Sequence, residues 1–179
     1  MGKFDTLDYL SEGNPKQKKV YQILTSNRVM DILADYSPIL TGTIPIAVDT
    51  EKSDLDIICH WTNIESFKSC LMNFSHYPDF ELYQKVSRGY QTVIARFLIE
   101  DLQVEIYEQN RPTKEQEAFK HMVVENRILI ENGEEFRKKV VELKRKGVKT
   151  EVAFGTLLGI KENHHEELLK FYQKNDDNI

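Results

Sequence analysis

The chain has 179 residues, a length that suits one domain or one core with a helical appendage. Its formal net charge of −5 disfavours a general binder of long nucleic acids, which would present a basic face. No apolar run approaches the roughly 20 residues of a membrane-spanning helix, and the N-terminal segment has no apolar core of a signal peptide. With two cysteines at a spacing untypical of metal sites, these features predict a cytoplasmic protein that contacts no membrane.

The first third of the chain alternates between helical and extended patterns. Asn14-Pro15 predicts the capped start of a helix, and Ser26 is expected to cap a second one. Segment 39–43 is then expected to be extended, and 55–61, "LDIICHW", to be a buried strand. A capping box at 62–65 predicts a further helix that runs to about residue 74.

The middle of the chain is β-rich, with strand patterns over 80–86, 90–98 and 102–108. A two-residue turn at Glu100-Asp101 would place Ile99 opposite Leu102 and, counting back, Arg96 opposite Glu105. One face of this hairpin is then apolar: Val93, Ala95, Phe97, Ile99, Leu102, Val104 and Ile106. The other face carries Arg96, Gln103, Glu105 and Tyr107. The consistency of the apolar face supports this register.

From Thr113 onward the hydrophobic period becomes helical. Thr113 and Gln116 are expected to open a long helix that Asn132-Gly133 closes. Further helices follow, two of them capped by Thr150 and Asn163. We therefore predict a mixed α/β core over 1–110 and a helical C-terminal subdomain over 111–179 that packs on it.

Two aspartates stand two residues apart where a strand pattern begins. Residues i and i+2 of a strand point to one face, so Asp54 and Asp56 should project together. Two ionised carboxylates about 4 Å apart repel by roughly 4 kcal/mol at an effective dielectric near 20, and a shared proton, a basic partner or a metal ion would relieve this. Hard oxygen ligands without nearby His or Cys favour Mg²⁺ or Mn²⁺. Glu105 offers a third carboxylate, so these three are the candidate metal-binding and catalytic residues.

A Gly-Thr pair upstream of the aspartates suits the binding of a triphosphate. Gly42 lets the backbone approach a phosphate closely, and Thr43 adds a hydroxyl donor. Ser53 could supply another donor. The cations expected to neutralise phosphate charge are Lys52, Arg88 and Arg96. Arg96 could instead serve only in a cross-strand ion pair with Glu105.

These motifs together resemble the nucleotidyltransferase superfamily that includes DNA polymerase beta and kanamycin nucleotidyltransferase. That superfamily carries a Gly-Ser pair, a spacer, a D-x-D or D-x-E, and a third carboxylate on an adjacent strand; here ten residues separate Thr43 from Asp54. By position, Gly42 and Thr43 correspond to the Gly-Ser pair, Asp54 and Asp56 to the metal-binding pair, and Glu105 to the third carboxylate. The resemblance implies a small mixed sheet flanked by helices, followed by a helical subdomain.

Most of the chain also resembles a family of short bacterial proteins known as a domain of unknown function. The similar stretches are 41–59, 104–129 and 143–160. The resemblance implies the fold but no established activity. The chain departs from the superfamily pattern at Thr43, which stands where Ser is usual, and at Ile44-Pro45, which follow the pair.

The predicted function is Mg²⁺- or Mn²⁺-dependent transfer of a nucleoside monophosphate from a nucleoside triphosphate to a hydroxyl of a small molecule, a protein or an RNA end. The alternative is a non-catalytic module that binds a nucleotide, an effector or a partner on the same fold, and the departure at Ile44-Pro45 favours it. A metal-dependent phosphate-ester hydrolase is a third hypothesis.

Several residues outside these motifs carry weaker signals. Four polar residues of the first C-terminal helix could line a cleft and read a base or an acceptor, although polar helix surface is their more common role: Gln116, His121, Glu125 and Arg127. Trp61 could stack on a nucleobase, although packing is more common. The adjacent His164 and His165 diverge by about 100° on a helix, which favours solvated surface over a metal site.

Overall fold

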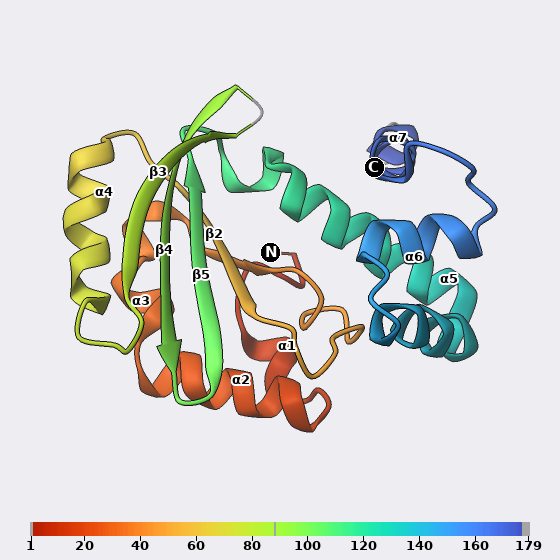
Figure 1. Ribbon diagram of the computed structural model, residues 1–179, viewed down its shortest axis with the longest axis horizontal. Coiled ribbons are helices and arrows are strands. Elements are labelled where there is room, and N and C mark those ends of the chain that lie inside the picture. Colours follow the sequence, from red (N-terminus) through yellow and green to blue (C-terminus); the bar gives the residue numbers. More distant parts are fainter. Residues whose placement is uncertain (1, 88, 177–179) are drawn as a thin grey trace.

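A five-stranded mixed sheet forms the centre of the computed structural model, which describes residues 2–87 and 89–176 (Figure 1). The strands are β1 (Ile39–Thr41), β2 (Leu55–His60), β3 (Glu81–Ser87), β4 (Tyr90–Ile99) and β5 (Leu102–Gln109). Their order across the sheet is β1-β2-β5-β4-β3. The β2–β5 pair is parallel and the other pairs are antiparallel. The prediction of a small mixed sheet flanked by helices is confirmed.

The helices fall into two groups. The first group packs on one face of the sheet and consists of α1 (Asp8–Ser11), α2 (Pro15–Ser26), α3 (Val29–Ile32) and α4 (Ile64–Leu71). The second group lies on the side of the opposite face (Figure 1). The second group is α5 (Glu117–Arg145), α6 (Thr150–Leu157) and α7 (His164–Asp176). Single 3₁₀ turns occur at Ala34–Tyr36, Met72–Phe74 and Thr113–Glu115. None of the described helices is long and apolar enough to cross a membrane.

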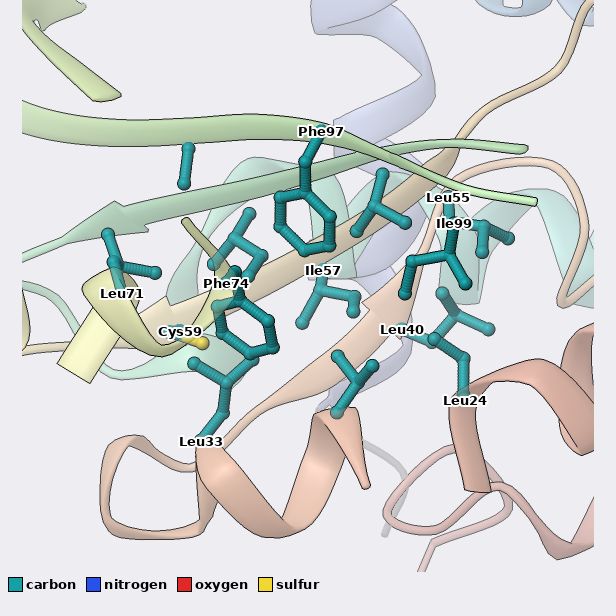
Figure 2. Packing of buried hydrophobic residues seen from close by; sticks show 14 of the residues in the cluster. Leu24, Leu33, Leu40, Leu55, Ile57, Cys59, Leu71, Phe74, Phe97 and Ile99 are labelled. Atoms are coloured by element: carbon teal, nitrogen blue, oxygen red, sulfur yellow. The ribbon is translucent and has the colours of Figure 1, made fainter. Parts of the chain in front are cut away.

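The hairpin register that the sequence predicts is confirmed. Ile99 pairs with Leu102, and Arg96 pairs with Glu105. The apolar face of this hairpin, which includes Phe97, packs against the first group of helices. Figure 2 shows this core from close by, where Phe97 and Phe74 stack with ring centroids 4.9 Å apart.

A second hydrophobic cluster joins the opposite face of the sheet to α5–α7. It contains Ile39 and Ile58 from the strands and Met122, Val140 and Phe154 from the helices. Because both halves of the chain contribute to this cluster, a domain boundary near residue 110 stays a prediction.

The loop between β1 and β2 is fixed to both groups of helices. Its Ile44 is buried in the first cluster, whereas Ile46 and Val48 are buried in the second. Gln17 Nε2 of α2 donates to the carbonyl oxygen of Ile44 at 2.8 Å, and Arg137 of α5 donates to that of Ile46. The residues that depart from the superfamily pattern therefore anchor this loop.

Four predicted helix starts differ from the structure. Thr150 is the first residue of α6 rather than its cap, because the N-cap position belongs to Lys149. Ser26 lies inside α2 rather than capping a new helix, and α3 begins after Arg28, whose φ is 53°. Asn63 rather than Thr62 caps α4, since its side chain accepts from the backbone N–H of residues 65 and 66. The 3₁₀ turn at Thr113–Glu115 precedes α5, and the side chain of Gln116 makes no capping hydrogen bond.

The expected end of the first C-terminal helix at Asn132-Gly133 is confirmed. Gly133 has φ 73° and ψ −169°, a non-helical conformation that separates two helical segments within α5, the second of which runs to Arg145. Only glycine adopts that backbone conformation at low cost. The two segments of α5 can therefore lean differently over the sheet while remaining one element of the chain.

Candidate active-site cleft

A cleft of about 550 Å³ separates the polar face of the sheet from the C-terminal helices. Its sheet side is formed by residues of β1, β2, β4 and β5, and its other side by α5, α6 and α7. The lining includes Thr41, Gly42, Thr43, Asp56, Tyr90, Glu105, Tyr107, Gln109, Arg111, Gln116, Glu117, His121, Glu125, Glu151 and His165. The volume falls in the range of small-molecule binding sites.

Asp56 and Glu105 lie side by side on the floor of the cleft. They are register partners on the parallel strands β2 and β5, and Arg96 is the partner of Glu105 on β4. Burial, followed by repulsion from Asp54 and Glu105, raises the pKa of Asp56 to about 7. Arg96 Nε donates to Glu105 Oε2 at 2.5 Å, so the cross-strand ion pair that the sequence allowed is formed.

Gly42 brings the β1–β2 loop directly against this floor. Its φ is 79°, and a Cβ on this residue would stand 2.5 Å from Oδ2 of Asp56. The next residue, Thr43, lines the cleft and donates through Oγ1 to Ser53 Oγ at 3.2 Å. Ser53 Oγ also accepts from the backbone N–H of Thr50 at 2.9 Å. Ser53 therefore closes the loop and lies outside the cleft lining.

The other predicted site residues that the structure describes lie outside the cleft lining. Asp54 immediately precedes the first residue of β2 and is exposed, although it is close enough to raise the pKa of Asp56. Lys52 is exposed in the turn before it. Arg96 is held by Glu105. Arg88 lies outside the described residues.

The carboxylates do not form a preassembled metal centre. Within residues 2–87 and 89–176, no group of three or more His, Cys, Asp or Glu side chains is placed to hold a metal ion. Glu105 is turned to Arg96, and Asp54 is exposed at the mouth. The donor set nevertheless fits Mg²⁺ chemically, because Asp56 and Glu105 offer adjacent hard oxygens whose mutual repulsion already raises the pKa of Asp56.

Three of the four polar residues singled out on the first C-terminal helix reach the cleft. Gln116, His121 and Glu125 line it. Arg127 instead pairs with Glu131 at 3.0 Å on the helix surface. Trp61 belongs to the hydrophobic cluster on the opposite face of the sheet, so it cannot stack on a ligand in this cleft.

Other lining residues were not singled out from the sequence as cleft residues. Tyr90 and Tyr107 come from the strands, and the guanidinium of Arg111 lies 5.4 Å from the ring centroid of Tyr90. From the far helices, Glu151 joins the lining, and His165 lies with its ring 3.9 Å from that of His121. The prediction that His165 is solvated surface is wrong, because α7 folds back over the start of α5.

One cation near the floor also lacked a sequence signal. Lys144 of α5 is partly buried, and burial lowers its pKa to about 8. The carboxylates of Glu125, Asp49, Glu151 and Asp56 oppose that shift, which places the ammonium within electrostatic reach of the cleft. Its position in the chain, within a run of Lys and Arg at a helix end, suggests only a helix-dipole role.

The family model described as "Domain of unknown function (DUF4269)" matches residues 22–171. The chain belongs to the DUF4269 family. No curated protein matches it significantly in sequence. Membership in DUF4269 assigns the chain to a family, but the description of that family names no activity.

Solved nucleotidyltransferases share the fold of this DUF4269 chain. A mutant of the Cid1 poly(U) polymerase bound to MgATP matches at 14% identity and TM-score 0.55, covering 85% of this chain and 53% of that one. A cytoplasmic RNA terminal U-transferase matches at 15% and 0.52, with 85% and 50% covered. The GLD-2/RNP-8 complex matches at 14% and 0.51, with 83% and 59% covered.

The DUF4269 chain spans about half the length of these structures. At such low identity the likeness extends to the fold alone. The chain therefore has a nucleotidyltransferase fold, and its activity has to be argued from its own residues.

Proposed function

We propose that this protein is a Mg²⁺-dependent nucleotidyltransferase that moves a nucleoside monophosphate from a nucleoside triphosphate to a hydroxyl group of an acceptor in the cleft. The observation that carries the proposal is the pairing of Asp56 and Glu105 on adjacent strands of the cleft floor, with Gly42 packed against Asp56. The shared fold of known nucleotidyltransferases supports it. A cytoplasmic setting, where Mg²⁺ and nucleoside triphosphates are abundant, is part of the proposal.

The carboxylates Asp54, Asp56 and Glu105 would hold Mg²⁺ or Mn²⁺. When bound, such an ion neutralises charge on the phosphate oxygens of the nucleotide. Glu105 would help to hold the ion while it remains paired with Arg96. Arg96 is therefore engaged by Glu105 rather than available to a phosphate.

The phosphate-binding residues would be Gly42 and Thr43, because both line the cleft beside Asp56. Gly42 leaves room for close approach of a phosphate, and the Thr43 hydroxyl can donate to one. The Thr43 hydroxyl donates to Ser53 Oγ at 3.2 Å, so it would exchange that acceptor for a phosphate oxygen when a nucleotide binds. Lys144 supplies positive charge near the floor, while Lys52 and Arg88 stay candidates for the outer phosphates.

The reaction proceeds by in-line displacement. The acceptor oxygen forms a bond to the α-phosphorus, the bond from that phosphorus to the bridging oxygen breaks, and pyrophosphate leaves. The proton of the acceptor hydroxyl passes to a carboxylate on the floor, Asp56 or Glu105.

The nucleobase would lie where Tyr90 and Tyr107 line the cleft together with Arg111, because aromatic rings and a guanidinium can both stack on a base.

Labelled nucleoside triphosphates test the proposal. The protein, Mg²⁺ and a cell extract are incubated with each triphosphate, and transferred nucleotide and pyrophosphate are measured by mass analysis. Transfer by the wild type, and its loss in Asp56→Asn, is the expected result. Asp101→Asn, a change in the exposed turn between β4 and β5, serves as the control.

The second candidate is a non-catalytic module that binds a nucleotide or an effector on the same fold. The observation that favours it is the engagement of Glu105 by Arg96, since that ion pair keeps the carboxylates from forming a complete metal group. Stable nucleotide binding without transfer or pyrophosphate release supports this candidate over the first. Loss of nucleotide without an acceptor adduct would instead indicate a phosphate-ester hydrolase.

A further inference from the structure

The helical side of the cleft is acidic. Glu117 and Glu125 stand at positions i and i+8 of α5 and therefore lie on one stripe of that helix. Glu151 joins them from the first turn of α6. Among the described lining residues, five carry a carboxylate and one, Arg111, carries a guanidinium. A triphosphate would be repelled by this side of the cleft.

Neighbouring cations offset only part of that acidity. His165 Nε2 lies 3.6 Å from Glu117 Oε2, and its charge depends on protonation. Lys144 interacts electrostatically with both Glu125 and Glu151, so one positive charge serves two carboxylates. Metal ions on the floor would neutralise Asp56 and its neighbours, not the helical side. Burial, followed by repulsion from Glu151, raises the pKa of Glu125 to about 8, and a cation bound beside it would oppose that shift.

Buried acceptor atoms on the same side point independently to a ligand that donates hydrogen bonds. Gln116 is 2% exposed, and its Nε2 donates to the carbonyl oxygens of Cys59 at 2.7 Å and Arg111 at 2.9 Å. Its Oε1 has no hydrogen-bond partner within the described part of the chain. A buried acceptor left without a donor is costly, so a ligand that donates a hydrogen bond to this oxygen would be favoured.

Glu125 presents a second buried carboxyl group on this side. It lines the cleft and is 4% exposed, and Lys144 is a cation within electrostatic reach of it. A carboxylate and an amide oxygen on one side of a cleft both require donors. An ammonium group supplies three donors and one positive charge, which meets both requirements.

We propose that Gln116, Glu125 and Glu151 form the acceptor subsite, and that the acceptor is a hydroxyl-bearing amine bound through a protonated amino group. This inference rests on the proposed nucleotidyl transfer. The nucleotide occupies the Gly42–Thr43 side of the floor, and the amine occupies the acidic helical side. A polyanionic acceptor such as an RNA end is repelled from the same residues.

Calorimetric titration of the full chain with spermidine, without nucleotide or Mg²⁺, tests the ammonium subsite. Spermidine is expected to bind the wild type, and to bind Glu125→Gln at least tenfold more weakly. Glycerol, which has hydroxyl groups but no amine, is expected not to bind either protein. Glu131→Gln is the matched control, because this residue lies on the same helix but faces solvent in a pair with Arg127. Absence of spermidine binding, or equal affinity for Glu125→Gln and the wild type, overturns the inference.

Two further measurements keep the test decisive. Glu151→Gln changes a more accessible residue at a helix start, so it is the second variant if Glu125→Gln fails to fold. Glu151→Gln should also weaken spermidine binding several-fold. Unchanged spermidine affinity in this variant contradicts the subsite. Binding of a Mg²⁺ complex of a non-hydrolysable triphosphate is measured in parallel. Triphosphate binding without spermidine binding overturns only the amine subsite, whereas spermidine binding without triphosphate binding overturns both the proposed transfer and the acceptor role of the subsite.

Acetylation of the amines in a small-molecule extract then tests the acceptor class directly. Treatment with acetic anhydride at neutral pH converts amines to neutral amides and leaves most hydroxyl groups intact. Nucleotide transfer is expected with the mock-treated extract and lost with the acetylated one. Equal transfer to both extracts contradicts an amine-bearing acceptor.

Discussion

Gly42 lies so close to Asp56 that no side chain fits between them: a Cβ on Gly42 would stand 2.5 Å from Asp56 Oδ2. This contact links the loop after β1 to the carboxylate on β2. It also explains why glycine precedes the threonine of the Gly-Thr pair. Glycine at this position lets the backbone of the loop pack directly against the Asp56 carboxylate.

Gly42→Ala should therefore damage both stability and nucleotide binding. The φ of 79° disfavours any side chain by about 1 kcal/mol, and the contact with Asp56 adds to that cost. Gly147→Ala is the matched control, because its φ is 88° but nothing lies within 4 Å of its Cβ position. Denaturant unfolding and binding of a Mg²⁺–triphosphate complex are measured for both variants. If Gly147→Ala weakens binding as much as Gly42→Ala, the contact has no special role.

Arg96→Met should raise the affinity for Mg²⁺. Arg96 holds Glu105 at 2.5 Å and adds positive charge beside Asp56, so its removal frees a carboxylate and lowers repulsion of the ion. We expect an increase of several-fold to about tenfold, equivalent to about 1 kcal/mol for a partly exposed charge pair. Calorimetric titration with MgCl₂ measures it. Arg127→Met, which breaks a surface pair of α5, should leave the affinity unchanged; a fall in affinity in Arg96→Met would argue that Arg96 assembles the site.

Glu108→Gln should remove a pH dependence of stability. Glu108 is fully buried on the face of the sheet away from the cleft, and burial raises the pKa of its carboxyl from 4.5 to about 10. Between these values the folded chain keeps a proton that the unfolded chain releases, so the free energy of unfolding falls as pH rises from about 4.5 to about 10.

The glutamine variant should gain about 4 kcal/mol relative to the wild type between pH 5 and pH 8, because an amide does not titrate. Urea unfolding at both pH values measures the difference. Glu81→Gln, a change on the exposed strand β3, should show no such gain. A constant difference between Glu108→Gln and the wild type across this pH range would refute the assignment of the titration to Glu108.

Arg137→Met should loosen the loop between β1 and β2. Arg137 donates from α5 to the carbonyl oxygens of Ile46 and Ala47, and those bonds tie the loop to the C-terminal helices. Amide hydrogen exchange within 42–50 should rise about tenfold for a loss of about 1.4 kcal/mol. Lys138→Met is the control, since Lys138 contacts only its helix neighbour Glu135 among the interactions described for it. Unchanged exchange in Arg137→Met would mean that the buried isoleucines alone hold the loop.

The hairpin could be predicted from sequence because its signals are local. A two-residue turn and strict alternation fix which residues face one another, so Ile99 meets Leu102 and Arg96 meets Glu105. The floor of the cleft follows from the same register. The adjacency of Asp56 and Glu105 then required only that β2 lie beside β5, which the superfamily resemblance implied.

Helix starts were harder to predict because several neighbouring residues can cap. Thr62 and Asn63 are both good caps, and only the observed bonds from the backbone N–H of residues 65 and 66 identify Asn63. Ser26 could cap a helix but extends one instead, and the break comes at Arg28 in a left-handed conformation. Local preference does not distinguish these outcomes.

The helical side of the cleft could not be assembled from sequence. Glu151 and His165 meet the first turns of α5 only because α6 and α7 pack back on that helix. The adjacent His164 and His165 did not indicate this packing, because their spacing on a helix does not show which of the two faces inward. Residues of the floor carry a motif, whereas residues of the opposite side are defined by long-range packing.

The central claim is that the carboxylates of the floor bind a triphosphate together with Mg²⁺. Equilibrium binding of a non-hydrolysable nucleoside triphosphate, with and without Mg²⁺, to the wild type, Asp54→Ala and Glu105→Gln tests it most directly. Our account predicts Mg²⁺-dependent binding by the wild type and a loss of at least tenfold in both variants. Mg²⁺–triphosphate affinity that is unchanged in Asp54→Ala and Glu105→Gln would contradict it.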